Sequence, residues 1–182
     1  MKDASKMLVR AALEDPEAFA AIVERYKAMV FSVAYHFFQN RGLAEDLAQE
    51  VFLELYRRLD RLESDVHLAF WLRRAISNKC IDYARRSKVN SDVALDAVPE
   101  LPAEAVSRDP LLAGRLRRAV QALPKRKRLV VILRFQEELE LAEIAEVLQM
   151  PLNTVKSTLH RTLSLLKKDL RKEGVPSLEA IH

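Results

Sequence analysis

The stretch that decides the fold is residues 140–166, ELAEIAEVLQMPLNTVKSTLHRTLSLL. Apolar side chains recur in it at helical spacing in two blocks, the first ending at Leu148 and the second starting at Leu152. Pro151 lacks an amide proton and disfavours helical backbone at Met150, so we expect one helix to end near Leu148 and another to begin near Leu152. Two helices joined so tightly predict a helix-turn-helix, whose second helix can enter a DNA major groove.

The outward face of that second helix favours DNA as the partner. Its side chains are hydrogen-bonding or cationic, with no carboxylate before Asp169, which suits base edges and phosphates. The face comprises Asn153, Thr154, Lys156, Ser157, His160, Arg161, Ser164, Lys167 and Lys168. The alternative is an ordinary solvated helix on the surface of a bundle.

The composition indicates an all-α protein. Of 182 residues only three are glycine, and Leu, Ala, Glu and Arg dominate without long β-branched alternations. The single cysteine, Cys80, excludes an internal disulfide framework and a multi-cysteine zinc site. The chain lacks an apolar run of about 18 residues, and its N-terminus lacks an apolar signal core. We therefore expect a soluble, cytoplasmic protein.

The net charge of +4 conceals a strong partition along the chain. Residues 57–88 hold nine basic and four acidic side chains, and residues 111–173 hold 14 basic and seven acidic ones. Between them, residues 89–110 hold one basic and five acidic side chains. Two basic blocks separated by an acidic one suggest two sites for polyanions, although charge that serves only solubility is the alternative.

The acidic block also marks where the chain divides. It contains three prolines, few large apolar residues and no sustained period, so we interpret 89–109 as a flexible linker. The predicted organisation is therefore an N-terminal helical domain over 1–88, the linker, a C-terminal helical domain over 110–173 and a tail over 174–182. Asp109 and Pro110 supply a helix cap and a first helical residue at the start of the second domain.

The second predicted helix of the N-terminal domain, residues 42–59, has opposed apolar and acidic sides. Its buried stripe is predicted to be Leu43, Leu47, Val51, Leu55 and Leu59, flanked by Ala44, Ala48, Phe52 and Tyr56. The other side carries Glu45, Asp46, Gln49, Glu50, Leu53 and Glu54. Carboxylates this close repel one another within an isolated helix, so a cationic partner would make them useful. A solvated acidic face with one stray leucine is the alternative.

The third predicted helix, residues 67–88, combines a basic side with aromatic rings. Its core side is predicted to be Leu72, Ala75, Ile76, Cys80 and Tyr83. Its outer side is predicted to be Arg73, Arg74, Asn78, Lys79, Asp82, Arg85 and Arg86, with Phe70 and Trp71 at its head. Rings beside cations suit single-stranded nucleic acid, because bases stack on rings while cations hold the backbone. Core packing is the alternative for Trp71.

A basic run, Lys125-Arg126-Lys127-Arg128, follows Pro124 in the first turn of another helix. Positive charge there opposes the helix dipole, and a bound phosphate would remove the conflict. A soluble basic turn without a ligand is the alternative.

Four motifs in this order resemble the sigma factors of bacterial RNA polymerase, most closely the short extracytoplasmic-function branch with domains two and four only. The motifs are AEDLAQEVFLELY, AFWLRRAISNKCIDYARR, ALPKRKRLVVILRF and LAEIAEVLQMPLNTVKSTLHR. The resemblance covers roughly residues 15–172. It implies a transcription initiation factor that binds core polymerase and promoter DNA, has no enzymatic activity or cofactor, and in some cases is held by an anti-sigma factor.

The resemblance also assigns residues to each contact. Core polymerase would bind Asp46, Gln49, Glu50, Leu53 and Glu54. The melted minus-10 strand would meet Trp71, Arg73, Asn78, Lys79, Asp82, Arg85 and Arg86, within a segment for strand opening that starts at Arg58. The minus-35 duplex would meet Asn153, Thr154, Lys156, Ser157, His160 and Arg161, and the second domain would sit on the polymerase flap.

Three positions depart from the family pattern. Gln149 and Glu138 stand where the family usually has glycine, and Thr158 stands where arginine is frequent. We expect Gln149 to adopt a left-handed turn conformation, at a cost for a residue with a Cβ. The fold tolerates such changes, whereas promoter preference is sensitive to them.

Two other classes of function compete with this assignment. An enzyme has little support, because the sequence has no Gly-x-x-x-x-Gly-Lys loop or His-Glu-x-x-His motif, and its four histidines lie in unrelated segments. A stand-alone helix-turn-helix regulator would explain the C-terminal domain, but not the acidic side of 42–59 or the basic, aromatic third helix.

Overall fold

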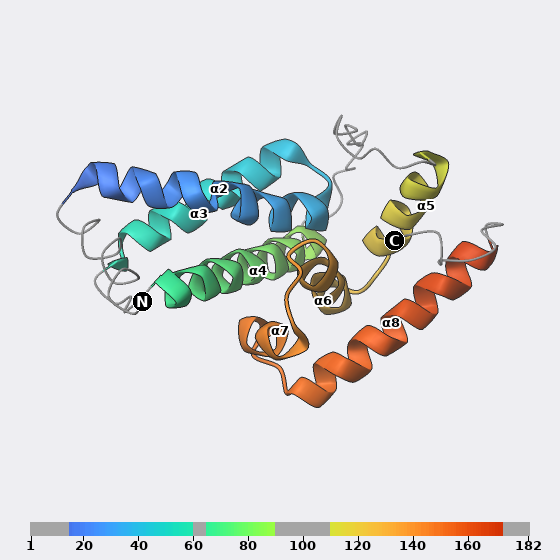
Figure 1. The fold of residues 1–182 in the computed structure, drawn as a ribbon. Coiled ribbons are helices and arrows are strands. Elements are labelled where there is room, and N and C mark those ends of the chain that lie inside the picture. Colours follow the sequence, from blue (N-terminus) through green and yellow to red (C-terminus); the bar gives the residue numbers. More distant parts are fainter. Residues whose placement is uncertain (1–14, 60–64, 90–109, 173–182) are drawn as a thin grey trace. The chain divides into compact units, whose positions relative to one another are not determined.

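The computed structural model describes residues 15–59, 65–89 and 110–172, and over these residues it is helical with no strand. The all-α prediction is therefore confirmed. The chain divides into two compact units, within Met1–Val98 and Pro99–His182 (Figure 1). The predicted linker, apart from Val89, and the predicted tail lie outside the described residues, as do Asp109 and residues 60–64.

The first unit packs three helices against one another: α2 (Pro16–Phe38), α3 (Arg41–Tyr56) and α4 (Asp65–Val89). Local capping sets the start of the first two. The Asp15 carboxylate accepts a hydrogen bond from the Glu17 amide at 2.9 Å, and the Asn40 side chain accepts one from the Leu43 amide at 2.9 Å. Between α2 and α3 the chain reverses at Gln39, whose φ of 54° is left-handed.

The core of this unit is formed by apolar residues of all three helices, and those from α3 and α4 include most of the stripes predicted from the sequence. Its fully or almost fully buried residues are Ile22, Val30, Val33, Phe37, Leu47, Val51, Leu55, Leu68, Leu72, Ile76 and Cys80. Burying one such aliphatic or aromatic side chain contributes about 1.5–3 kcal/mol, so this core, more than intrinsic helix propensity, stabilises the three helices.

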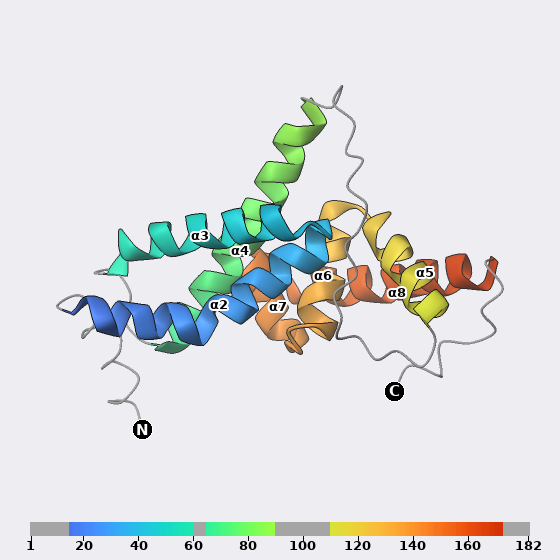
Figure 2. The same cartoon turned by 90° about the horizontal axis from the view of Figure 1, so that it is seen from above.

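Two tyrosines assigned to the core lie at its edge, and for both of them the prediction was wrong. Tyr56 is 61% exposed in the last turn of α3, where its ring and that of Phe19 meet in a T-shaped arrangement with centroids 5.1 Å apart. Tyr83 is 37% exposed and meets Phe38 edge-on at 5.4 Å. The final turns of α4 extend past α2 and α3 (Figure 2), so this part of the core-facing stripe has few neighbours to cover it.

The second unit consists of α5 (Pro110–Gln121), α6 (Lys125–Phe135), α7 (Leu141–Leu148) and α8 (Leu152–Lys172). Helices α5, α6 and α7 all pack against α8. Its core comprises Leu123, Leu129, Val130, Ile132, Leu133, Leu139, Ile144, Val147, Val155, Leu166 and Leu170. The helix-turn-helix prediction is confirmed, including the end of the first helix at Leu148 and the start of the second at Leu152.

The turn between α7 and α8 has the backbone expected from the sequence. Gln149 lies in the left-handed region at φ 51° and ψ 49°. The Gln149 amide donates to the Glu146 carbonyl at 3.2 Å and the Met150 amide donates to the Ala145 carbonyl at 2.9 Å, which satisfies carbonyls at the end of α7. Glu138, the other position where the family usually has glycine, is also left-handed at φ 53°.

Arg128 is a structural residue of this unit. Its guanidinium donates to the Gln121 side chain at 3.0 Å, to the Gln121 carbonyl and to the Leu123 carbonyl at 3.2 Å. These oxygens end α5 and form the turn into α6, so the arginine caps one helix from the first turn of the next. The basic run is therefore not uniformly available to a phosphate.

Replacing Gln149 with glycine should stabilise the protein, because glycine adopts positive φ without the Cβ penalty. We expect a gain of about 0.5–1 kcal/mol in the free energy of unfolding of the second unit, measured by urea denaturation of the full chain. Gln136 provides the matched control, since it also ends a helix but has a right-handed φ of −95°. Gln136→Gly should have no stabilising effect, and equal gains at both positions would contradict the strain at Gln149.

Replacing Arg128 with methionine should destabilise the second unit by about 1–3 kcal/mol, because partly buried carbonyls lose their donor. The control is Arg126→Met, which removes the same charge from an exposed neighbouring side chain. Thermal denaturation of both variants checks the prediction. A similar, small change in the two would show that Arg128 is merely part of a solvated basic turn.

Candidate nucleic-acid interface

The outward face of α8 gathers all six residues predicted to contact duplex DNA. Val155 and Thr162 are fully buried on the opposite side and so fix the rotation of the helix. The exposed residues are Asn153, Thr154, Lys156, Ser157, His160 and Arg161. Ser157 donates its hydroxyl to the Thr154 carbonyl at 3.1 Å, so its oxygen remains available as an acceptor. This end of α8 offers donors and cations together, without a carboxylate.

Side-chain contacts at the connection between α6 and α7 hold the start of α7 in place. Arg134 of α6 donates to the Leu139 carbonyl at 3.0 Å and approaches the Glu140 carboxylate at 3.5 Å, just before α7. Glu143 accepts from the Glu140 amide at 2.7 Å and so closes the first turn of α7. Because α7 packs against α8, the helix that presents its side chains to a groove rests on a supported neighbour.

On α4, most of the residues predicted to meet single-stranded DNA share one outward stripe. Trp71 is half-buried, and Asn78, Asp82 and Arg85 are exposed at spacings of three or four residues. Arg85 is tethered to Asp82 at 3.2 Å, and Arg86 lies exposed beside it. The rotation of α4 therefore places the tryptophan with the polar residues, at the border between core and solvent.

Two predicted strand contacts lie apart from this stripe. Arg73 is half-buried with its Nε atom enclosed, whereas its neighbour Arg74 is exposed in line with Asn78. Adjacent helical residues differ in direction by about 100°, so only one of two consecutive arginines can lie in the stripe. The structure thus points to Arg74, which sequence reasoning had placed on the outer side but not among the strand contacts. The second residue, Lys79, is turned toward α3.

The acidic side of α3 is exposed as predicted. Asp46, Gln49 and Glu50 are exposed, Glu54 is half-buried, and Leu53 is 53% exposed among them. An exposed leucine within a group of carboxylates is an apolar anchor with an anionic surround, which suits a protein surface that carries cations.

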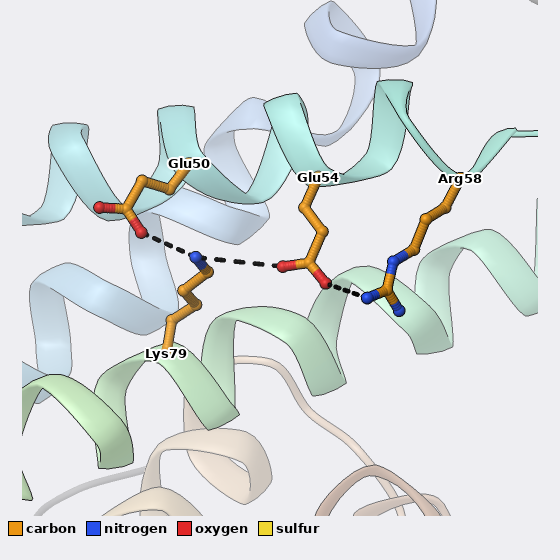
Figure 3. A network of polar contacts seen from close by, with 4 residues as sticks. All are labelled: Glu50, Glu54, Arg58 and Lys79. Atoms are coloured by element: carbon orange, nitrogen blue, oxygen red, sulfur yellow. Dashed lines mark hydrogen bonds and ion pairs between the residues drawn. The ribbon is translucent and has the colours of Figure 1, made fainter.

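Ion pairs join this acidic side to α4 (Figure 3). The Lys79 ammonium lies 2.7 Å from a Glu50 oxygen and 4.0 Å from a Glu54 oxygen, while Glu54 also pairs with Arg58 at 3.2 Å. Lys79, predicted to contact DNA, and the two glutamates, predicted to contact polymerase, therefore form one network. Sequence spacing gave no signal of it, because Glu50 and Lys79 lie 29 positions apart.

Other kinds of site have no support among the described residues. Within 15–59, 65–89 and 110–172, no cluster of three or more potential metal-ligating side chains occurs. Over the same ranges no helix is both long enough and apolar enough to cross a membrane.

Comparison with known proteins agrees with this arrangement. Residues 22–89 match the family model for sigma-70 region 2, and residues 113–166 match that for sigma-70 region 4. The chain is 33% identical over 173 residues to the ECF RNA polymerase sigma factor SigW of Bacillus subtilis, covering 86% of this chain and 91% of that protein. It is 30% identical to the RNA polymerase sigma-H factor of Pseudomonas aeruginosa, covering 86% and 88% of the two chains.

Solved structures support the same fold. The sigma factor RpoE of Bartonella quintana, in complex with the anti-sigma factor NepR, has a TM-score of 0.71 at 22% identity, over 84% of this chain and 96% of that one. CnrH in complex with the cytosolic domain of CnrY also gives 0.71 at 22% identity, over 94% and 99% of the two chains. With both sigma-70 regions matched in order and a curated relative similar along most of its length, the chain belongs to the extracytoplasmic-function branch of the sigma-70 family, the promoter-recognition factors of bacterial RNA polymerase.

Proposed function

We propose that the chain initiates transcription by joining core RNA polymerase to promoter DNA through three surfaces. The acidic side of α3 binds core polymerase, the outward stripe of α4 holds the melted minus-10 strand, and the N-terminal half of α8 reads the minus-35 duplex. Sigma domain 2 then corresponds to residues 1–88 and sigma domain 4 to residues 110–173, with the connection and the tail between and after them. The protein acts in the cytoplasm, where polymerase and chromosome are found.

The observation that carries the proposal is the separation of charge by surface. The outward face of α8 is free of carboxylates up to Asp169, whereas the exposed side of α3 is rich in them. A cationic face attracts phosphates and an anionic face repels them, so α3 is unsuited to DNA and suited to a protein partner. A stand-alone regulator would need only the α8 surface. That hypothesis gives no role to the N-terminal unit, which matches sigma-70 region 2.

The side chains of the two DNA surfaces suit different forms of DNA, duplex on α8 and single strand on α4. Lys156 and Arg161 on α8 can each reach a base edge or a phosphate, while Asn153 and Thr154 offer shorter donors and acceptors. On α4, the half-buried Trp71 lies one turn from the exposed Arg74, which suits an unpaired base beside its backbone. Neither surface needs a cofactor, because recognition and strand capture proceed by binding alone.

An anti-sigma factor is a further class of partner in the proposal. The Bartonella quintana relative in the solved complex is bound to one, and it shares the fold of this chain. A protein that covers the acidic side of α3 or the outward face of α8 would block polymerase or promoter contacts directly.

Truncating Leu53 should weaken core binding without weakening the fold. Because the side chain is 53% exposed, Leu53→Ser should leave the melting temperature nearly unchanged. If Leu53 is the apolar anchor, affinity for core polymerase should fall about tenfold, measured by fluorescence anisotropy of the labelled chain. Leu165→Ser, which changes an exposed leucine on α8 (42%), controls for general loss of apolar surface. Unchanged affinity in Leu53→Ser would mean that core binds elsewhere.

The α8 surface should bind promoter duplex weakly alone and strongly in the holoenzyme. A small domain with few phosphate contacts binds duplex with steep salt dependence, whereas tethering by polymerase raises its effective concentration. The measurement is promoter binding and strand opening, with and without core, across a salt series. Tight, specific duplex binding by the chain alone, unaffected by core, would overturn the proposed function.

Substitutions should separate the two DNA surfaces within the holoenzyme. Lys156→Ala or Arg161→Ala should weaken duplex binding by about 1–3 kcal/mol if the side chain contacts a base, and should flatten the salt dependence if it contacts a phosphate. Asn78→Ala or Arg85→Ala should impair opening and leave duplex binding intact. The same defect from both pairs would argue against separate surfaces.

A further inference from the structure

Lys79 lies where the polymerase surface and the single-strand surface meet. Its ammonium reaches from α4 across to Glu50 and Glu54 on α3, at 2.7 Å and 4.0 Å (Figure 3). Along α4 it precedes Asp82 by three residues and Arg86 by seven, so its Cα lies beside the residues proposed to hold the melted strand. One cation is therefore within reach of two different binding sites.

The ion pair between Lys79 and Glu50 can break easily, so that Lys79 can take another partner. The Lys79 side chain keeps 28% of its surface exposed and that of Glu50 keeps 53%, so water reaches the pair and screens its attraction. The flexible four-carbon stem of lysine allows the ammonium to move by several ångströms while the helix stays in place.

The two negative and two positive charges of the network balance only while Glu50 and Glu54 are not bound to cations of another protein. Glu50, Lys79, Glu54 and Arg58 alternate in sign along the network. A polymerase surface that brings its own cations to Glu50 and Glu54 satisfies these carboxylates and leaves Lys79 among positive charges. Repulsion then favours movement of the ammonium away from α3, toward a strand phosphate on the adjacent face of α4.

We propose that Glu50 and Glu54 withhold Lys79 from DNA in the free protein and that docking on core polymerase releases it to the melted strand. The inference rests on the proposed function, since it assumes both surfaces. It adds a direct electrostatic link between them, beyond the tethering that polymerase supplies. By linkage, strand binding at Lys79 frees the glutamates and strengthens core binding by the same factor.

The first test uses the free full-length chain and a fluorescein-labelled oligothymidylate. Glu50→Gln removes the shorter ion pair and should release Lys79 for one additional phosphate contact. At about 0.1 M salt this contact should raise affinity about fivefold, and the slope of log affinity against log salt should steepen by about 0.7. Unchanged affinity and slope would overturn the inference.

Two controls separate release of Lys79 from a general change in charge. Glu24→Gln removes the same charge from an exposed ion pair of equal length, 2.7 Å to Lys27, on α2, and should leave the slope unchanged. In a Lys79→Met background, Glu50→Gln should no longer strengthen binding. An equal gain with lysine or methionine at position 79 would show that the glutamate acts only through net charge.

The second test compares the free chain with the holoenzyme. Lys79→Met should lower oligothymidylate affinity by a much smaller factor in the free chain than in the holoenzyme, because in the free chain the lysine is already held by glutamates. In the holoenzyme it should lower affinity for the same probe about fivefold. Equal losses in both states would overturn the inference. If the wild-type chain fails to assemble with core at all, the proposed function fails instead, so the two failures are distinguishable.

Discussion

Burial of one apolar stripe per helix is the constraint on which the rest of the structure depends. In α8 the stripe of Val155, Leu166 and Leu170 packs against the other helices of its unit, and this alone decides which side chains face outward. The same holds for α4, where burial of Leu72, Ile76 and Cys80 turns Asn78 and Arg85 to solvent. The side chains available for recognition are thus those that remain exposed once the apolar stripe of each helix is buried. A substitution that rotated or loosened a stripe would damage binding without touching a binding residue.

Charge is distributed over the outward faces in a way that stability alone does not explain. Neighbouring carboxylates on α3 and a carboxylate-free cationic face on α8 both raise self-repulsion within the protein. On α3 the fold offsets this repulsion locally, through Arg41 beside Glu45 and through Lys79 and Arg58 beside Glu50 and Glu54. Exposed pairs of this kind contribute little to stability, typically below about 1 kcal/mol. The arrangement becomes favourable when each face meets a partner of opposite charge, and membership of the sigma-70 family provides such partners.

Features that depend on local backbone chemistry could be predicted from the sequence. Pro151 placed the boundary between α7 and α8 to the residue, and Gln149 could be identified as left-handed from the family comparison. Features that depend on where a neighbouring helix ends could not be predicted from the sequence. Tyr56 and Tyr83 fit the apolar period, yet each lies near the end of its helix, where little packs over it. The direction of Lys79 was equally hidden, because a long side chain on the edge of a stripe can turn either way and only the packing of α3 against α4 decides.

Each of the two units has its own core, so their binding surfaces can be weak separately and strong together. A single helix face on α8 and a short stripe on α4 each make few contacts, and few contacts mean rapid dissociation and little discrimination. When both surfaces belong to one chain held on polymerase, the second contact forms at high effective concentration, and the two affinities multiply rather than add. Weakness of each surface is then useful, since the free chain does not occupy DNA unproductively. In our proposal Lys79 is shared between the polymerase face and the strand face, and this would strengthen the dependence because the strand surface would be completed only where polymerase is already bound.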